Sequence, residues 1–188
     1  MKKNKVVLYI IFLLTTLGLI ALDQFSKVLA INHLKDKEPI VIIKGVFELL
    51  YVENKGAAYG MLAGKISFFL IITFILVPVI IYSIFKISII IEYFGDKVNI
   101  KAFKILQLDM IIILAGAIGN CIDRVTKGYV VDYFYFKLID FPVFNVADCY
   151  ITVAVAVMLI MCFFILKDKE LDYLMGSKKK WQVDDESK

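Results

Sequence analysis

Two short units of the same form, an asparagine followed three positions later by an aspartate, lie in the second half of the chain. They are Asn120–Asp123 and Asn145–Asp148, and another acid, Asp132, lies between them. Residues three apart share one face of a helix, so each unit can present an amide beside a carboxylate. Two carboxylates brought together in a low dielectric share one proton. Such a pair can activate a water molecule and protonate a carbonyl oxygen without a metal or a covalent intermediate.

Each acid also has a simpler interpretation. Asn145 followed by Asp148 is typical of a capping box at the start of a helix. Asp132 is compatible with an exposed loop acid, although its neighbours in the sequence are apolar. Asp123 falls at the end of a predicted helix, where the helix dipole opposes negative charge. It therefore needs a partner, such as Arg124 or nearby backbone amides.

Other candidate catalytic groups are isolated. His33 is the single histidine, and the three cysteines show no Cys-x-x-Cys spacing, so neither a zinc site nor a disulfide framework is predicted. No serine lies in a Gly-x-Ser-x-Gly turn. Cys149, beside Asp148, is a candidate nucleophile, but no base is evident near it. We therefore expect no metal and no cofactor.

The composition indicates that these groups belong to a membrane protein. Of the 188 residues, 61% are apolar and 14% aromatic, against about 45–50% apolar residues in soluble domains. The mean hydropathy of +0.81 excludes an ordinary soluble enzyme. A bilayer span needs about 20 mostly apolar residues, and four spans are predicted, at about 6–22, 66–86, 105–122 and 148–166. We interpret residues 1–166 as one membrane-embedded domain and 167–188 as a charged cytoplasmic tail, solvated or loosely helical.

Two of the four predicted spans are less regular than the others. The first is also compatible with a signal peptide, but its 17 residues exceed the apolar core typical of one, and Ile20–Leu22 is a poor cleavage site. We therefore interpret it as an uncleaved span. The third has only 13 uncharged residues, Met110–Ile122, so it must extend back through Asp109.

The distribution of lysines predicts that both termini are cytoplasmic. Lysines precede the first span and occupy the loop between the second and third, at Lys2, Lys3, Lys5, Lys97, Lys101 and Lys104. Residues 23–65 and 123–147 then face outward. The net charge of +4 lies in patches between apolar runs, which is typical of membrane topology and not of nucleic-acid binding.

The outward-facing segments contain strand-like sequence. Two β-branched and aromatic runs, 39–45 and 46–52, flank a turn at Lys44 and Gly45, and a third run covers 128–136. The fold class expected is thus an integral membrane protein, mainly α-helical, with four transmembrane helices and a small extracytoplasmic β-element.

Five motifs, in this order, resemble those of bacterial lipoprotein signal peptidases, the type II signal peptidases. They are Asp23–Lys27, Asn54–Gly60, Gly119–Arg124, Gly128–Asp132 and Phe144–Asp148. The resemblance extends from about residue 6 to 166 and includes the layout of four spans. Small departures from the family pattern are Tyr59, where phenylalanine is common, and Cys149, where serine is common.

The resemblance implies an aspartic endopeptidase of the bacterial cytoplasmic membrane. It implies removal of signal peptides from prolipoproteins, by a cut just before the diacylglyceryl-modified cysteine, with Asp132 and Asp148 as the catalytic dyad. The other matched positions, which would shape the site or lie near bound peptide, are Asn54, Gly56, Asn120, Asp123, Arg124 and Asn145. The expected partners are lipidated prolipoproteins and membrane lipids, with no nucleic acid; we expect a monomer that is inhibited by globomycin-type peptides.

Four further positions have structural interpretations. Asp23 matches the polar end of the first span, where an i, i+4 ion pair with Lys27 is at least as good an explanation as a direct role. Gly116 and Gly119 favour close helix packing over contact with substrate.

The alternative from another class is a small membrane carrier or proton-coupled subunit. Ionisable groups within a membrane are expensive and point to function, so a row of acids can relay protons. The acids concerned are Asp109, Asp123, Asp132 and Asp148. Three of them gather at the outer interface, and we interpret Asp109 as a first-turn helix acid. A scaffold protein is a third alternative, which no feature favours.

Overall fold

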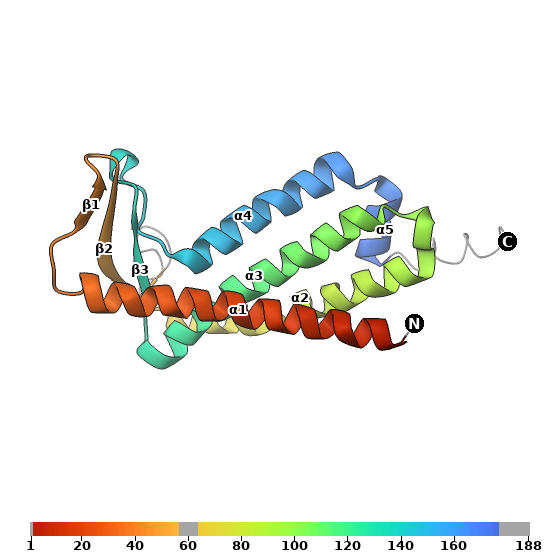
Figure 1. Ribbon diagram of the computed structural model, residues 1–188, viewed down its shortest axis with the longest axis horizontal. Coiled ribbons are helices and arrows are strands. Elements are labelled where there is room, and N and C mark those ends of the chain that lie inside the picture. Colours follow the sequence, from red (N-terminus) through yellow and green to blue (C-terminus); the bar gives the residue numbers. More distant parts are fainter. Residues whose placement is uncertain (1, 57–63, 177–188) are drawn as a thin grey trace.

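The computed structural model describes residues 2–56 and 64–176 of the chain, and within them a helical bundle carries a small sheet at one end (Figure 1). The long helices are α1 (Lys2–Leu34), α2 (Ile66–Phe94), α3 (Ile100–Lys127) and α4 (Val146–Ile160). The strands are β1 (Ile40–Ile43), β2 (Phe47–Asn54) and β3 (Val130–Tyr135). Shorter helical segments are η2 (Gly95–Lys97), η3 (Lys137–Ile139), η4 (Met161–Ile165) and α5 (Asp168–Met175).

Four helical stretches of the described chain are long and apolar enough to cross a membrane, as predicted. They are Lys5–Leu34, Ile66–Lys97, Ile100–Lys127 and Val146–Ile165. Half of the most apolar window of α3 is buried inside the protein, against 6–11% for the other three. The central helix is therefore α3, and it packs against α1, α2 and α4.

Helices α1, α2 and α3 run further than the predicted spans. The apolar run of α1 stops before Asp23, yet the helix continues to Leu34. Asp23 and Lys27 are one turn apart and form an ion pair, so the helix passes through them without an unpaired charge. Beyond them, Ala30 and Leu34 are buried under the sheet, against Val131 and Tyr133.

The predicted hairpin is present, and β3 extends it to three antiparallel strands in the order β1–β2–β3. Gly45 takes a left-handed φ of 74° in the β1–β2 turn, where a side chain would be strained. In the second pairing, Val52 of β2 lies opposite Asp132 of β3. The sheet therefore fixes the position of one predicted catalytic residue.

At the opposite end, the tail is helical in α5, as our interpretation allowed, but as far as Gly176 it is packed against the bundle and not solvated. Tyr173 is fully buried and stacks on Phe94 of α2. The carboxylate of Glu170 accepts hydrogen bonds from the backbone amides of Asn99 and Lys167, at 2.6 and 2.9 Å. This part of the tail closes the end of the bundle far from the sheet (Figure 1).

Candidate active site

The two Asn-x-x-Asp units meet where α3 ends and α4 begins. Close approach of the two helices depends on Gly116, because a Cβ there would lie 2.7 Å from the carbonyl oxygen of Ala147 and 2.8 Å from Cγ1 of Ile151. Gly119 has the same role toward α1, since a Cβ there would collide with the carboxylate of Asp23. The packing role expected for both glycines is confirmed.

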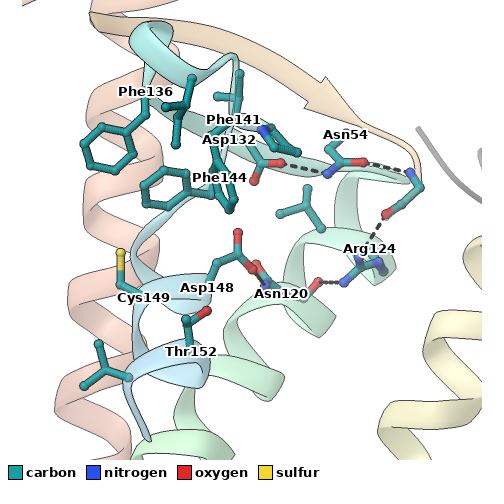
Figure 2. Close-up of a pocket in the computed structure, with 16 residues that line it drawn as sticks. Asn54, Asn120, Arg124, Asp132, Phe136, Phe141, Phe144, Asp148, Cys149 and Thr152 are labelled. Atoms are coloured by element: carbon teal, nitrogen blue, oxygen red, sulfur yellow. Dashed lines mark hydrogen bonds between the residues drawn. The ribbon is translucent and has the colours of Figure 1, made fainter. Parts of the chain in front are cut away.

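Asp132 and Asp148 line one cavity of about 570 Å³, which lies under the sheet (Figure 2). Asp132 comes from β3 and is 2% exposed, so the interpretation as an exposed loop acid is wrong. Asp148 comes from the first turn of α4 and is half-buried. Asn54, Gly56, Asn120 and Arg124 line the same cavity.

Amide groups hold both carboxylates. The Nδ2 atom of Asn145 donates to Oδ1 of Asp132 at 2.6 Å and to Oδ1 of Asn120 at 3.1 Å. In turn, Nδ2 of Asn120 donates to Oδ1 of Asp148 at 2.8 Å. From β2, Nδ2 of Asn54 donates to Oδ2 of Asp132 at 2.8 Å (Figure 2). Among the described residues, the side chains that donate to the two aspartates are thus all neutral amides.

The capping box predicted for α4 is also present, and it belongs to the same network. Asn145 has an extended backbone (φ −133°, ψ −176°) and caps the helix, its Oδ1 accepting from the amide of Asp148 at 3.1 Å. Its own backbone amide donates to Oδ2 of Asp148 at 3.1 Å. The capping box is therefore confirmed, and the same cap orients the carboxylate that lines the cavity.

Burial gives Asp132 an unusual affinity for protons. Loss of solvation, followed by the negative charge of Asp148, raises the pKa of Asp132 to about 7. The hydrogen bonds from Asn54 and Asn145 act in the opposite direction, because they stabilise the ionised form. Near neutral pH this carboxyl group can therefore hold or release a proton, as acid–base chemistry requires.

A second pair of acids, Asp23 and Asp123, lies close by and has charged partners. Nζ of Lys27, fully buried, lies 2.9 Å from Oδ2 of Asp23 and 3.2 Å from Oδ2 of Asp123. Lys127 adds an ion pair to Oδ1 of Asp123 at 2.6 Å, and the backbone amide of Val131 donates to Oδ2 at 3.1 Å. Of the partners expected for Asp123, the backbone amide is correct and Arg124 is wrong.

Lys27 connects the ion pairs of Asp23 and Asp123 to the amide groups that hold Asp132 and Asp148. Its Nζ donates to Oδ1 of Asn120 at 2.9 Å. Because an ammonium group has no acceptor, this contact fixes the carbonyl side of the Asn120 amide toward Lys27 and its NH₂ group toward Asp148. The ion pair with Asp23 was predicted from spacing, but this contact across 93 positions has no local signal in the sequence.

Arg124 lies at the edge of the cavity and not on the dyad. Its guanidinium group donates to the carbonyl oxygens of Gly56 and Asn120, both at 3.4 Å, and lies 4.6 Å from the ring centroid of Phe69. The amide of Gly56 in turn donates to Oδ1 of Asn54 at 2.9 Å. These contacts connect the end of β2 to α3. Residues 57–60 of this motif, Tyr59 and Gly60 included, lie outside the described residues.

The apolar wall of the cavity was missed by our sequence analysis. It is formed by residues after β3 and in α4, namely Phe136, Ile139, Phe141, Pro142, Val143, Phe144, Cys149, Thr152 and Val153. Phe136 and Phe144 stack with ring centroids 5.7 Å apart. The unusual number of phenylalanines between 134 and 144 was the available signal.

Asp109 lies apart from these groups, on the far half of α3. The helix begins at Ile100 after an Asn99 cap, so Asp109 is not in the first turn and that expectation is wrong. It is 4% exposed, and its Oδ2 atom has no hydrogen-bond partner among the described residues.

The fold and the site together define a multi-pass membrane protein with a pair of carboxylates in a cavity at one end of its bundle. A family model described as signal peptidase (SPase) II matches residues 15–164. The chain belongs to this family of peptidases.

Individual relatives agree with that assignment. The chain is 36% identical over 163 residues to lipoprotein signal peptidases of Streptococcus pyogenes serotypes M5 and M18, a match that covers 87% of this chain and 96% of each relative. Among solved structures, it is similar to a bacterial membrane enzyme determined by the in meso method at 2.3 Å resolution. The TM-score is 0.65 and the identity 31%, over 80% of this chain and 86% of that one.

Proposed function

We propose that this protein is an aspartic endopeptidase that removes signal peptides from prolipoproteins, cutting just before the diacylglyceryl-modified cysteine. The observation that carries the proposal is the position of Asp132 and Asp148, which line one cavity and accept hydrogen bonds from neutral amides. The family assignment makes prolipoproteins the expected substrates.

In the proposed mechanism the dyad starts with one proton. The ionised carboxylate takes a proton from a water molecule as the water oxygen attacks the scissile carbonyl carbon, while the protonated carboxyl gives its proton to the carbonyl oxygen. The product of this step is a neutral gem-diol. The first carboxyl then protonates the amide nitrogen as the C–N bond breaks, and the second takes a hydroxyl proton from the gem-diol. The dyad thereby returns to its starting state.

The two sides of the cavity suit the two parts of such a substrate. The polar side carries the dyad and its amides, whereas the other side is apolar and aromatic and includes Phe136, Phe141 and Val153. A lipidated cysteine brings acyl chains to the membrane surface, and each CH₂ group that stays buried contributes about 0.8 kcal/mol. We infer that the apolar side lies next to these chains while the scissile bond meets the dyad.

The direct test is cleavage of a diacylglyceryl-modified prolipoprotein by the purified protein in detergent, with the unlipidated precursor in parallel. We expect the lipidated form to be cut just before its cysteine, and the unlipidated form to be cut far more slowly. Inhibition by a globomycin-type peptide is also expected, and the protein should be active as a monomer. Equal cleavage of both precursors would rule out interfacial recognition, and cleavage of neither would contradict the proposed function.

The proposed location is the bacterial cytoplasmic membrane, with both termini in the cytoplasm and the dyad at the outer face. It rests on the lysine-rich N-terminal segment and inner loop. A membrane-impermeant amine reagent on intact spheroplasts should label Lys55, on the sheet side, and spare Lys101, at the other end of α3. Labelling of Lys101 would invert the topology and place the dyad on the wrong side for an exported substrate.

A further inference from the structure

One face of α3, at the end of the bundle opposite the dyad, is uncovered. Lys101, Lys104, Ile105 and Leu108 lie on it at i, i+3, i+4 and i+7 spacing, which is one side of a helix. All of these side chains are exposed, Ile105 at 39% and Leu108 at 49%. The face thus consists of two cations at the helix end, followed immediately by apolar side chains toward the middle of the membrane-spanning stretch.

The neighbouring helices leave this face open for a clear reason. Near its N-terminus α1 packs on α2, where the Tyr9 and Phe85 rings lie 4.9 Å apart and Lys5 pairs with Glu92. Figure 1 shows α4 well separated from α1 at this end, with α3 between them. In this view α1 and α4 diverge away from the sheet.

Two hollows adjoin the face and share Lys104. The first, of about 530 Å³, is lined by Ile100, Lys101, Lys104, Ile105 and Leu108. The second, of about 360 Å³, lies between α1, α2 and α3 and is lined by Lys5, Leu8, Phe12, Ser88, Ile91, Glu92, Lys104 and Gln107. Lys104 therefore lies at the boundary of two concave surfaces that are otherwise mainly apolar.

The charges of this region are not balanced by the described part of the chain. Lys101 and Lys104 form no ion pair or hydrogen bond with any described residue, and no acid lines the first hollow. In the second hollow, Glu92 is already paired with Lys5. Two unpaired cations thus lie beside hydrocarbon-lined surface at the end of a membrane-spanning helix.

We propose that this face binds one anionic phospholipid of the membrane, with its phosphate between Lys101 and Lys104 and an acyl chain over Ile105 and Leu108. Both halves of such a molecule are matched: the phosphate is complementary to two unpaired ammonium groups, and the chain covers apolar side chains one turn away. A soluble anion matches only the lysines, and an apolar protein segment matches only the apolar residues. The site lies at the opposite end of α3 from the dyad and does not depend on the proposed peptidase activity.

The test is native mass spectrometry of the full-length protein in neutral detergent, titrated with phosphatidylglycerol or with phosphatidylcholine of the same acyl chains. We expect one phosphatidylglycerol to remain bound and phosphatidylcholine to bind more weakly. The K101Q/K104Q variant should lose about thirtyfold in affinity for phosphatidylglycerol, which corresponds to two surface lysines at about 1 kcal/mol each. K101R/K104R, which keeps both charges, should bind as the unchanged protein does.

The control variant, K44Q/K97Q, also removes two positive charges, but elsewhere. Lys97 is at the same end of the bundle but lines neither hollow, and Lys44 is on the β1–β2 turn, so this variant should leave binding unchanged. The proposal would be overturned if K101Q/K104Q retained phosphatidylglycerol as well as the unchanged protein does, or if the unchanged protein retained the two lipids equally. Loss of binding in K101R/K104R would also overturn it. Displacement of the lipid by millimolar inorganic phosphate would also overturn it, because the acyl chain would then contribute nothing.

Discussion

Two pairs of aspartates lie close together at one end of the bundle and have opposite kinds of partner. Asp23 and Asp123 face the ammonium groups of Lys27 and Lys127. Asp132 and Asp148 face amides that carry no charge. An ammonium group compensates the charge of a buried carboxylate, whereas a neutral amide does not. From the type of partner we assign a structural role to the first pair and propose that the second is the reactive pair.

The two pairs are also dependent on each other through one residue. Oδ1 of Asn120 accepts a hydrogen bond from Lys27 of the first pair, and Nδ2 of Asn120 donates one to Asp148 of the second. Asp123, one turn further along α3, also pairs with Lys27, so both networks depend on the same buried ammonium group. The reactive pair is thus oriented by a charge that it does not contact directly.

The largest effect expected is on cleavage, from Asp132→Asn and Asp148→Asn. An amide keeps the shape but cannot exchange the proton, so each variant should lose about 10²- to 10⁴-fold in turnover or more, while remaining folded. The measurement is cleavage of a lipidated prolipoprotein by purified variants. Asp36→Asn, the same change at an exposed outer acid, is the matched control. Near wild-type turnover in either dyad variant would remove the distinction between the pairs.

The second-largest effect expected is a loss of stability in the Lys27→Met variant. This change leaves two buried acids with one fewer cation, and loss of one partner from a buried ion pair costs about 3–5 kcal/mol. Lys127→Met should be milder, because the side chain of Lys127 is 25% exposed and that of Lys27 is fully buried. Thermal unfolding in detergent measures both. Equal destabilisation by the two changes would contradict the assigned central role of Lys27.

A smaller effect is expected on the pH dependence of cleavage. Because the pKa of Asp132 is raised to about 7, the pair loses its shared proton as the pH increases through that value, and turnover should decline on the alkaline side. Asn54→Ala removes a hydrogen bond that stabilises the ionised form, so the alkaline limb should move to higher pH. The shift expected for one neutral hydrogen bond is on the order of half to one pH unit. A shift to lower pH would contradict the arrangement.

The smallest effect is expected at Cys149, which lines the cavity but has no role in the proposed chemistry. Cys149→Ser should cleave within about twofold of the unchanged protein, because the hydroxyl is close in size to the thiol. EDTA and serine-directed reagents should also leave the rate unchanged, although a bulky thiol adduct can block the cavity. Loss of activity in a folded Cys149→Ser variant would favour a catalytic thiol.

Much of this molecule follows from local patterns in the sequence. Apolar runs predict four membrane-spanning helices, β-branched and aromatic runs around a Lys-Gly turn predict the hairpin, and the spacing of Asn145 and Asp148 predicts their capping box. The length of α1 does not follow from such a pattern, because its apolar run ends at Leu22 while the helix continues to Leu34. Periodicity detects which face is apolar, but it does not detect a charge pair that lets a helix continue.

Local patterns in the sequence specify the helices and strands and the acids at their ends. This is possible because hydrogen bonds within a turn and apolar periodicity act over only a few residues. Which acids face ammonium groups and which face neutral amides depends instead on how the helices and the sheet pack. Asp123 has Arg124 beside it in the sequence, yet its partners are Lys27 and Lys127. Lys27 reaches Asp123 and Asn120 from α1 because Gly119 lets α1 and α3 approach closely, and such an approach depends on how whole helices pack.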